Sequence, residues 1–218
     1  MREIFSKQLQ DLFTSVKDMG ILCEKAIEKA AQSVLLDNQS EETYKSISKS
    51  VNSFEKEIDQ KEREVENLCM RLLLHQQPVA SDLRTVSSAL KLISDMERIG
   101  DQASDITELS KYIRSCGEQH KIHLSEMFTA TINLVNESLN TFINHDLEKA
   151  KQVIKGDDAI DALFDKVKLD LINMIKEETN PETCIDLLMA AKYLERIGDH
   201  AVNIAEWVVY SITGEHKE

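Results

Sequence analysis

The chain has 218 residues, with 39 acidic side chains against 26 basic ones and a formal net charge of −13. Only 6 Gly and 2 Pro occur, which argues strongly against an all-β protein, because such folds need turn residues every ~8–12 positions. A surface this negative repels nucleic acid and anionic lipid, and no run of Lys or Arg counters it. We therefore expect no nucleic-acid partner. No apolar run approaches the ~20 residues of a membrane span.

Apolar residues recur at helical spacing through most of the chain, so the sequence predicts an all-α protein. Four turn signals separate the helices. Asp37-Asn38-Gln39-Ser40 is an N-cap signal before Glu41, and Ser115-Cys116-Gly117 ends the third helix. Thr179-Asn180-Pro181 opens the sixth helix, and Gly214 closes it. Long helices with short connections favour an antiparallel bundle. In chain order, the predicted helices cover residues 2–36, 41–75, 79–114, 120–144, 147–178 and 182–213.

The chain contains an internal repeat. The segment Glu-Arg-Ile-Gly-Asp at 97–101 recurs at 195–199, an offset of 98 residues. An acidic segment at 55–59 resembles 157–161, an offset of 102. Two pairs of similar segments in the same order indicate a duplicated unit of three helices. The sequence therefore predicts two tandem, pseudo-symmetric three-helix bundles built from six long helices, which we divide at 1–116 and 117–218.

Each half carries two copies of an acid-xxx-acid pattern, which places two carboxylates one turn apart on one helix face. On a helical wheel all four pairs lie directly beside the apolar stripe, on the same side of it. Two antiparallel neighbouring helices can turn these acidic edges toward each other, so we expect the carboxylates to converge. Asp105 and Asn203 extend the pattern by one turn in each half. The four pairs are Glu55 with Asp59, Glu97 with Asp101, Asp157 with Asp161, and Glu195 with Asp199.

Converging carboxylates repel one another unless a cation joins them, and oxygen ligands suit Mg, Ca, Mn or iron. Gly100 and Gly198 precede an acid in each half. They either allow a close approach at a metal site or simply let two helices pack tightly. Arg84 could reach the same seam. The histidines His75, His123 and His200 are further candidate ligands, although a lone histidine is more often structural.

The duplicated Glu-Arg-Ile-Gly-Asp segment, with acid-xxx-acid on the preceding helix, resembles the PhoU family of bacterial phosphate-uptake regulators. The string Gln77-Pro78-Val79-Ala80-Ser81-Asp82-Leu83-Arg84 and the start of the chain from Arg2 to Gly20 carry the same resemblance. It extends over essentially the whole length. The two halves differ in detail: Gln102 stands where the second copy has His200, and the second half has no Asp-Leu-Arg equivalent.

This resemblance implies two tandem bundles with metal clusters on the repeated acidic motifs. Iron is the metal we expect, with zinc, manganese or magnesium as alternatives. It also implies a cytoplasmic, non-enzymatic homodimer that acts between the ATPase subunit of a phosphate ABC transporter and a sensor histidine kinase. Such a protein is peripheral to the membrane through its partners only, and it restrains the phosphate-starvation response when phosphate is plentiful.

Two other interpretations compete with a metal-binding regulator. A di-iron enzyme also uses carboxylates in a helical bundle, with the signature Glu-x-x-His. None of the six histidines has an acidic residue three positions before it. A metal-free helical adaptor would leave the acids as solvated faces. Metal analysis of protein purified without chelator would separate these alternatives.

Overall fold

The computed structural model describes residues 2–36, 40–113, 121–177 and 180–215. In these ranges the chain is helical and contains no strand, which confirms the all-α fold class. The predicted boundary between residues 116 and 117 lies outside the described residues, and the division there stays a prediction. The helices are α1 (Arg2–Leu35), α2 (Glu41–Gln76), α3 (Ser81–Ile113), α4 (Ile122–Asn144), α5 (Leu147–Lys155), α6 (Asp157–Lys176) and α7 (Pro181–Thr213).

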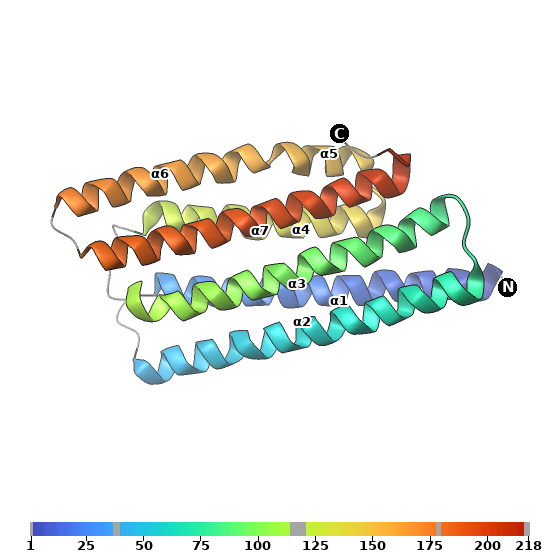
Figure 1. Ribbon diagram of the computed structural model, residues 1–218, viewed down its shortest axis with the longest axis horizontal. Coiled ribbons are helices and arrows are strands. Elements are labelled where there is room, and N and C mark those ends of the chain that lie inside the picture. Colours follow the sequence, from blue (N-terminus) through green and yellow to red (C-terminus); the bar gives the residue numbers. More distant parts are fainter. Residues whose placement is uncertain (1, 37–39, 114–120, 178–179, 216–218) are drawn as a thin grey trace.

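The helices form two layers. α2, α3, α7 and α6 lie side by side in one layer, and α1 and α4 lie behind them (Figure 1). The halves join where α3 packs along α7 and α1 packs against α4, and α5 lies against α7 and α4. One continuous apolar core fills the space between the layers. None of the described helices has an apolar stretch long enough to cross a membrane.

The predicted turn signals are confirmed at three helix ends, and the fourth, Ser115-Cys116-Gly117, lies outside the described residues. The Ser40 side chain accepts a hydrogen bond from the Thr43 backbone N–H at 3.1 Å and caps α2. Asn180 accepts from the Glu182 N–H at 3.0 Å, and Pro181 occupies the first position of α7. Gly214 ends α7 with φ of +80°, a left-handed conformation that glycine adopts without strain.

The predicted fifth helix, residues 147–178, is wrong as one continuous helix. It is interrupted at Gly156, which closes α5 with a hydrogen bond from its N–H to the Val153 carbonyl and precedes α6. Glycine is a poor helix former, and a Cβ there would lie 3.0 Å from Leu134 Cδ1 on α4. Asp157 and Asp158 then sit in the first turn of α6, where the helix dipole favours negative charge.

The two halves use equivalent contacts. A Cβ at Gly100 on α3 would lie 2.9 Å from Ile58 Cδ1 on α2, and one at Gly198 on α7 would lie 2.8 Å from Ile160 Cδ1 on α6. These pairs match at the repeat offsets of 98 and 102. The predicted pseudo-symmetry is therefore confirmed, and each glycine serves close helix packing, since the atom nearest its added Cβ is apolar.

Candidate metal centre

Two acidic seams border these glycine contacts. Because Ile58 and Gly100 bring α2 and α3 together, the acids beside this contact on the two helices lie near one another. The same argument holds for Ile160 and Gly198 between α6 and α7. The first acidic seam consists of Glu55, Asp59, Glu97 and Asp101. The second acidic seam consists of Asp157, Asp161, Glu195 and Asp199.

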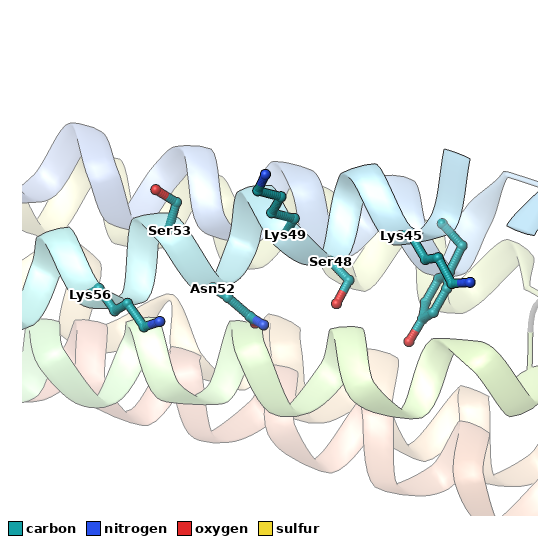
Figure 2. Close-up of a pocket in the computed structure, with 7 residues that line it drawn as sticks. Lys45, Ser48, Lys49, Asn52, Ser53 and Lys56 are labelled. Carbon is teal, nitrogen blue, oxygen red and sulfur yellow. The ribbon is translucent and has the colours of Figure 1, made fainter. Parts of the chain in front are cut away.

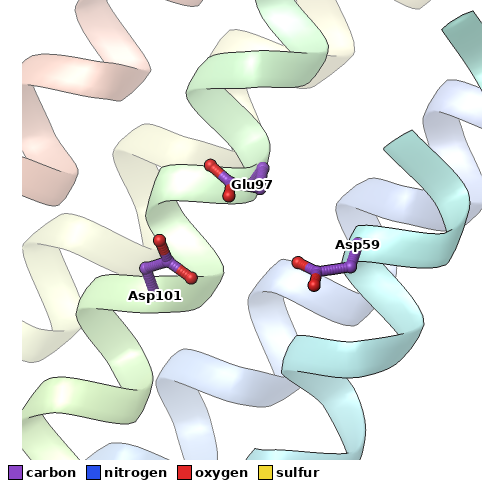
Figure 3. A group of neighbouring side chains, drawn as sticks. All are labelled: Asp59, Glu97 and Asp101. Atoms are coloured by element: carbon purple, nitrogen blue, oxygen red, sulfur yellow. The ribbon is translucent and has the colours of Figure 1, made fainter. Parts of the chain in front are cut away.

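Three carboxylates of the first acidic seam converge. Asp59 reaches from α2 toward Glu97 and Asp101 on α3, and one oxygen of each lies within 4.8 Å of the others (Figure 3). The exposed Arg63 guanidinium approaches Asp59 Oδ2 at 3.8 Å, one turn along the same helix. Exposed pairs of this kind contribute little, so most of the negative charge stays uncompensated.

Burial and repulsion between carboxylates raise the pKa values of three acids of this seam, Glu55, Glu97 and Asp101. Desolvation is the larger cause for Glu55, Glu97 and Asp101, and neighbouring carboxylates add to it. The charges of Asp101 and Asp59 raise the pKa of both glutamates, and the charge of Asp59 raises the pKa of Asp101. Such groups bind protons more readily than free carboxylates, and for the same reason they favour a multivalent cation.

The second acidic seam is more open and already holds an ammonium group. Asp161 and Asp199 are exposed, and the Lys192 ammonium contacts Glu195 Oε2. The pKa of Asp157 is raised by burial and then by Asp199 and Asp161. Asp157 Oδ1 is buried and has no hydrogen-bond partner among the described residues. This seam therefore collects four acids without closing them around one point as tightly as the first.

Asp105 and Asn203 lie on the interface between α3 and α7. Asn203 Nδ2 donates to Asp95 Oδ1 at 3.2 Å, and His200 Nδ1 donates to the same oxygen at 2.9 Å. Burial, Glu108 and Asp101 raise the pKa of Asp105, whereas Arg196 of α7 lowers it. The Asn203 amide is thus engaged in joining the two halves rather than directed into a seam.

Asp95 is a residue that the repeat could not reveal. It is only 7% exposed, yet the corresponding position in the second half is Tyr193, so no repeated acid marks it. A buried carboxylate needs partners, and here they come from the other half. The sequence feature that could have indicated its burial is its position among the apolar residues Leu92, Ile93 and Met96.

The remaining candidate residues lie elsewhere in the structure. The prediction that Arg84 reaches a seam is wrong: its Nε and Nη2 donate to the Ser211 and Ile212 carbonyls at 3.2 and 3.4 Å, at the end of α7.

His123 on α4 pairs with Asp170 on α6. His75 is exposed in the last turn of α2. Among the described residues, no histidine joins the converging carboxylates.

A second charged feature is an open groove of 440 Å³ along α2, seen in Figure 2. Lys45 is paired with Glu41 at 3.7 Å, and Asn52 accepts a hydrogen bond from Ser104 at 3.5 Å. All its lining residues come from this one helix, so it gathers no converging catalytic groups. They are Tyr44, Lys45, Ser48, Lys49, Asn52, Ser53 and Lys56.

The first acidic seam fits a metal ion by its donor set. Its oxygens come from two helices and already converge, and burial together with neighbouring carboxylates raises the pKa of Glu97 and of Asp101. Carboxylate oxygens suit hard and borderline cations. A cation held by Asp59, Glu97 and Asp101 would neutralise the seam and join α2 to α3.

Comparison with known proteins places this architecture in a family. The model of the PhoU domain matches twice, over residues 16–110 and 124–208. The chain is similar to the phosphate-specific transport system accessory protein PhoU homolog of Clostridium acetobutylicum, with 33% identity over 98% of this chain and 96% of that one. The homolog from Deinococcus radiodurans is 29% identical over the full length of both chains. The chain belongs to the PhoU family.

Solved structures agree with this assignment. The crystal structure of PhoU from Pseudomonas aeruginosa matches with a TM-score of 0.86 at 29% identity, covering 97% of this chain and all of that one. The phosphate transport system regulatory protein PhoU from Streptococcus pneumoniae matches with a TM-score of 0.85 at 26% identity, covering 98% and 99%. These relatives are named as accessory or regulatory proteins and not as enzymes.

Proposed function

We propose that this chain is a non-enzymatic regulator that couples phosphate transport to the phosphate-starvation response and restrains that response when phosphate is plentiful. The observation that carries the proposal is the match of the PhoU domain model to both halves. Full-length relatives named as accessory proteins of the phosphate-specific transport system support it. The structure adds long exposed helix faces of the kind that partner proteins recognise.

Two partners follow from this role: the ATPase subunit of the phosphate ABC transporter and the sensor histidine kinase of the response. The chain would work in the cytoplasm as a homodimer and reach the membrane only through these partners. Affinity capture of the tagged full chain from its native host, at high and at low phosphate, tests this. We expect both partners to be recovered in a phosphate-dependent ratio, whereas recovery of neither would contradict the proposal.

A multivalent cation, with iron as the leading candidate, is part of the proposal. Asp59, Glu97 and Asp101 would hold it in the first seam, helped by Glu55, and the four acids of the second seam form the weaker counterpart. Because a cation that binds only the folded chain adds its binding free energy to stability, it would stiffen each bundle. Metal analysis of protein purified without chelator tests this, and Asp101→Ala together with Asp199→Ala should lower the metal content.

A further inference from the structure

The two acidic seams differ at positions that the repeat makes equivalent. At the offset of 98, Lys192 of α7 stands where α3 has Ser94. At the offset of 102, Phe164 of α6 stands where α2 has Glu62. In the first half, Ser94 Oγ donates a hydrogen bond to Glu62 Oε1 at 3.2 Å, so a neutral group meets a further carboxylate. In the second half an ammonium and a phenyl ring occupy the same places.

Lys192 is held over the second seam by two contacts. Its ammonium pairs with Glu195 Oε2, on a side chain that is only 17% exposed, and lies 5.7 Å from the centre of the Phe164 ring. The cation–π contact and the ion pair favour the same side-chain position. The positive charge also acts on the next acid along the helix: burial and Glu195 raise the pKa of Asp199, and the Lys192 ammonium opposes that rise.

We propose that Lys192 is a built-in counter-ion of the second acidic seam, which makes that seam the weaker of two cation sites. The inference rests on the metal binding proposed above. A cation entering the second seam must displace the ammonium from Glu195 or bind beside it. The first seam has Ser94 at the equivalent place, and within the described residues its acids form one ion pair, between Asp59 and the exposed Arg63.

The size of the difference follows from the interaction of charges. Like charges a few ångströms apart repel one another at a protein surface, and solvent screens part of this repulsion because the Lys192 side chain is 46% exposed. A divalent cation therefore loses affinity when an ammonium stays nearby, and we expect the two seams to differ at least about tenfold in dissociation constant.

The experiment is a manganese titration of the full chain after chelator treatment, with free Mn²⁺ measured by its paramagnetic resonance signal. The wild-type protein should show a tight and a weak class of sites. Asp101→Asn should remove the tight class and Asp199→Asn the weak one, which assigns each class to a seam. The circular dichroism spectrum of each variant shows that it is folded.

Two reciprocal substitutions then test the role of the ammonium. Lys192→Met keeps the length of the side chain and should tighten the weak class at least about tenfold. Ser94→Lys carries the ammonium into the first seam and should weaken the tight class by a similar factor. Lys168→Met is the matched control, since Lys168 lies 5.6 Å from the same ring centre but pairs with Asp165. It should leave both classes nearly unchanged.

The outcomes separate this inference from the function on which it rests. The inference is supported if the dissociation constants of the two classes of site become similar in Lys192→Met. It is overturned, with metal binding left intact, if the two constants differ as much in Lys192→Met as in the wild type, or if the wild type shows a single class of site. No binding of manganese or of ferrous iron by any variant overturns the proposed metal binding and the inference with it.

Discussion

At the scale of single residues, the main feature is the negative charge of the first acidic seam, which nearby basic side chains compensate only in small part. Asp101 faces Asp59 across the first seam, and burial, followed by the charge of Asp59, raises the pKa of Asp101. The pKa of Glu97 is raised as well, so in the metal-free protein Asp101 and Glu97 bind protons more tightly in the folded state than in the unfolded one. The free energy of unfolding must therefore fall as pH rises from the ordinary values of 3.8 for Asp and 4.5 for Glu through the raised ones.

The first prediction concerns Asp101→Asn. In metal-free protein at pH 7 this change should raise the free energy of unfolding by about 0.5 kcal/mol, because it removes a like-charge repulsion. It should also flatten the decline of stability with rising pH. Chemical denaturation at several pH values, with chelator present, measures both effects. Asp18→Asn, on the exposed face of α1, is the control. A loss of stability at pH 7 with an unchanged pH slope would contradict the account.

Sequence patterns predicted the acids of the seams but not the residues that distinguish them. The angular position of Asp59 or Asp199 follows from its own helix. Lys192 and Asp95 gain their roles from a neighbouring helix, Lys192 through Phe164 of α6 and Asp95 through His200 of α7. A single helical wheel contains no information about that neighbour, so tertiary contacts were needed.

At the scale of helices, the spacing of α2 and α3 depends on Gly100. A Cβ there would lie 2.9 Å from Ile58 Cδ1 and 3.4 Å from its Cγ2. A methyl group alone could be accommodated by rotation of the isoleucine, and the better helix propensity of alanine would offset part of the cost. A branched side chain cannot be accommodated in this way.

The second prediction follows for Gly100→Val. It should lower the free energy of unfolding by about 2 kcal/mol through overpacking against Ile58, and it should weaken metal binding because the two helices move apart. Thermal or chemical unfolding measures the first effect. In the double variant with Ile58→Ala, the cost should be smaller than the sum of the single costs. Strictly additive costs would show that the two residues do not share this contact.

Helix positions were predicted well where local chemistry decides them. Ser40, Asn180 and Gly214 satisfy backbone groups at helix ends, and their residue types reveal this directly. The interruption at Gly156 was missed because the apolar periodicity continues across it. Its packing against Leu134 of α4 is a tertiary contact that periodicity does not report.

At the scale of the whole molecule, the two halves share one core and are joined by polar contacts at one end and near the middle of the α3–α7 interface. The internal repeat predicted two similar units but not how they pack, because a repeat offset does not specify a partner surface. Arg84 of the first half binds the last carbonyls of α7 in the second, and Asp95 binds His200 and Asn203.

The third prediction is that Arg84→Ala destabilises the molecule as a whole. Loss of two charge-assisted hydrogen bonds to α7 should cost about 2 kcal/mol of unfolding free energy. Hydrogen exchange should show faster exchange at the C-terminal turn of α7 and at the start of α3. Lys91→Ala, an exposed basic residue on the same helix, should change neither measurement. Equal effects of both substitutions would contradict the bridging role.

The most direct test of the central claim is the phosphate-starvation response in a strain that lacks this gene. We expect a reporter of that response to be switched on in phosphate-rich medium, and the wild-type gene supplied in trans to restore repression. Normal repression in the deletion strain, with no second copy of the gene present, would contradict the proposed regulatory function.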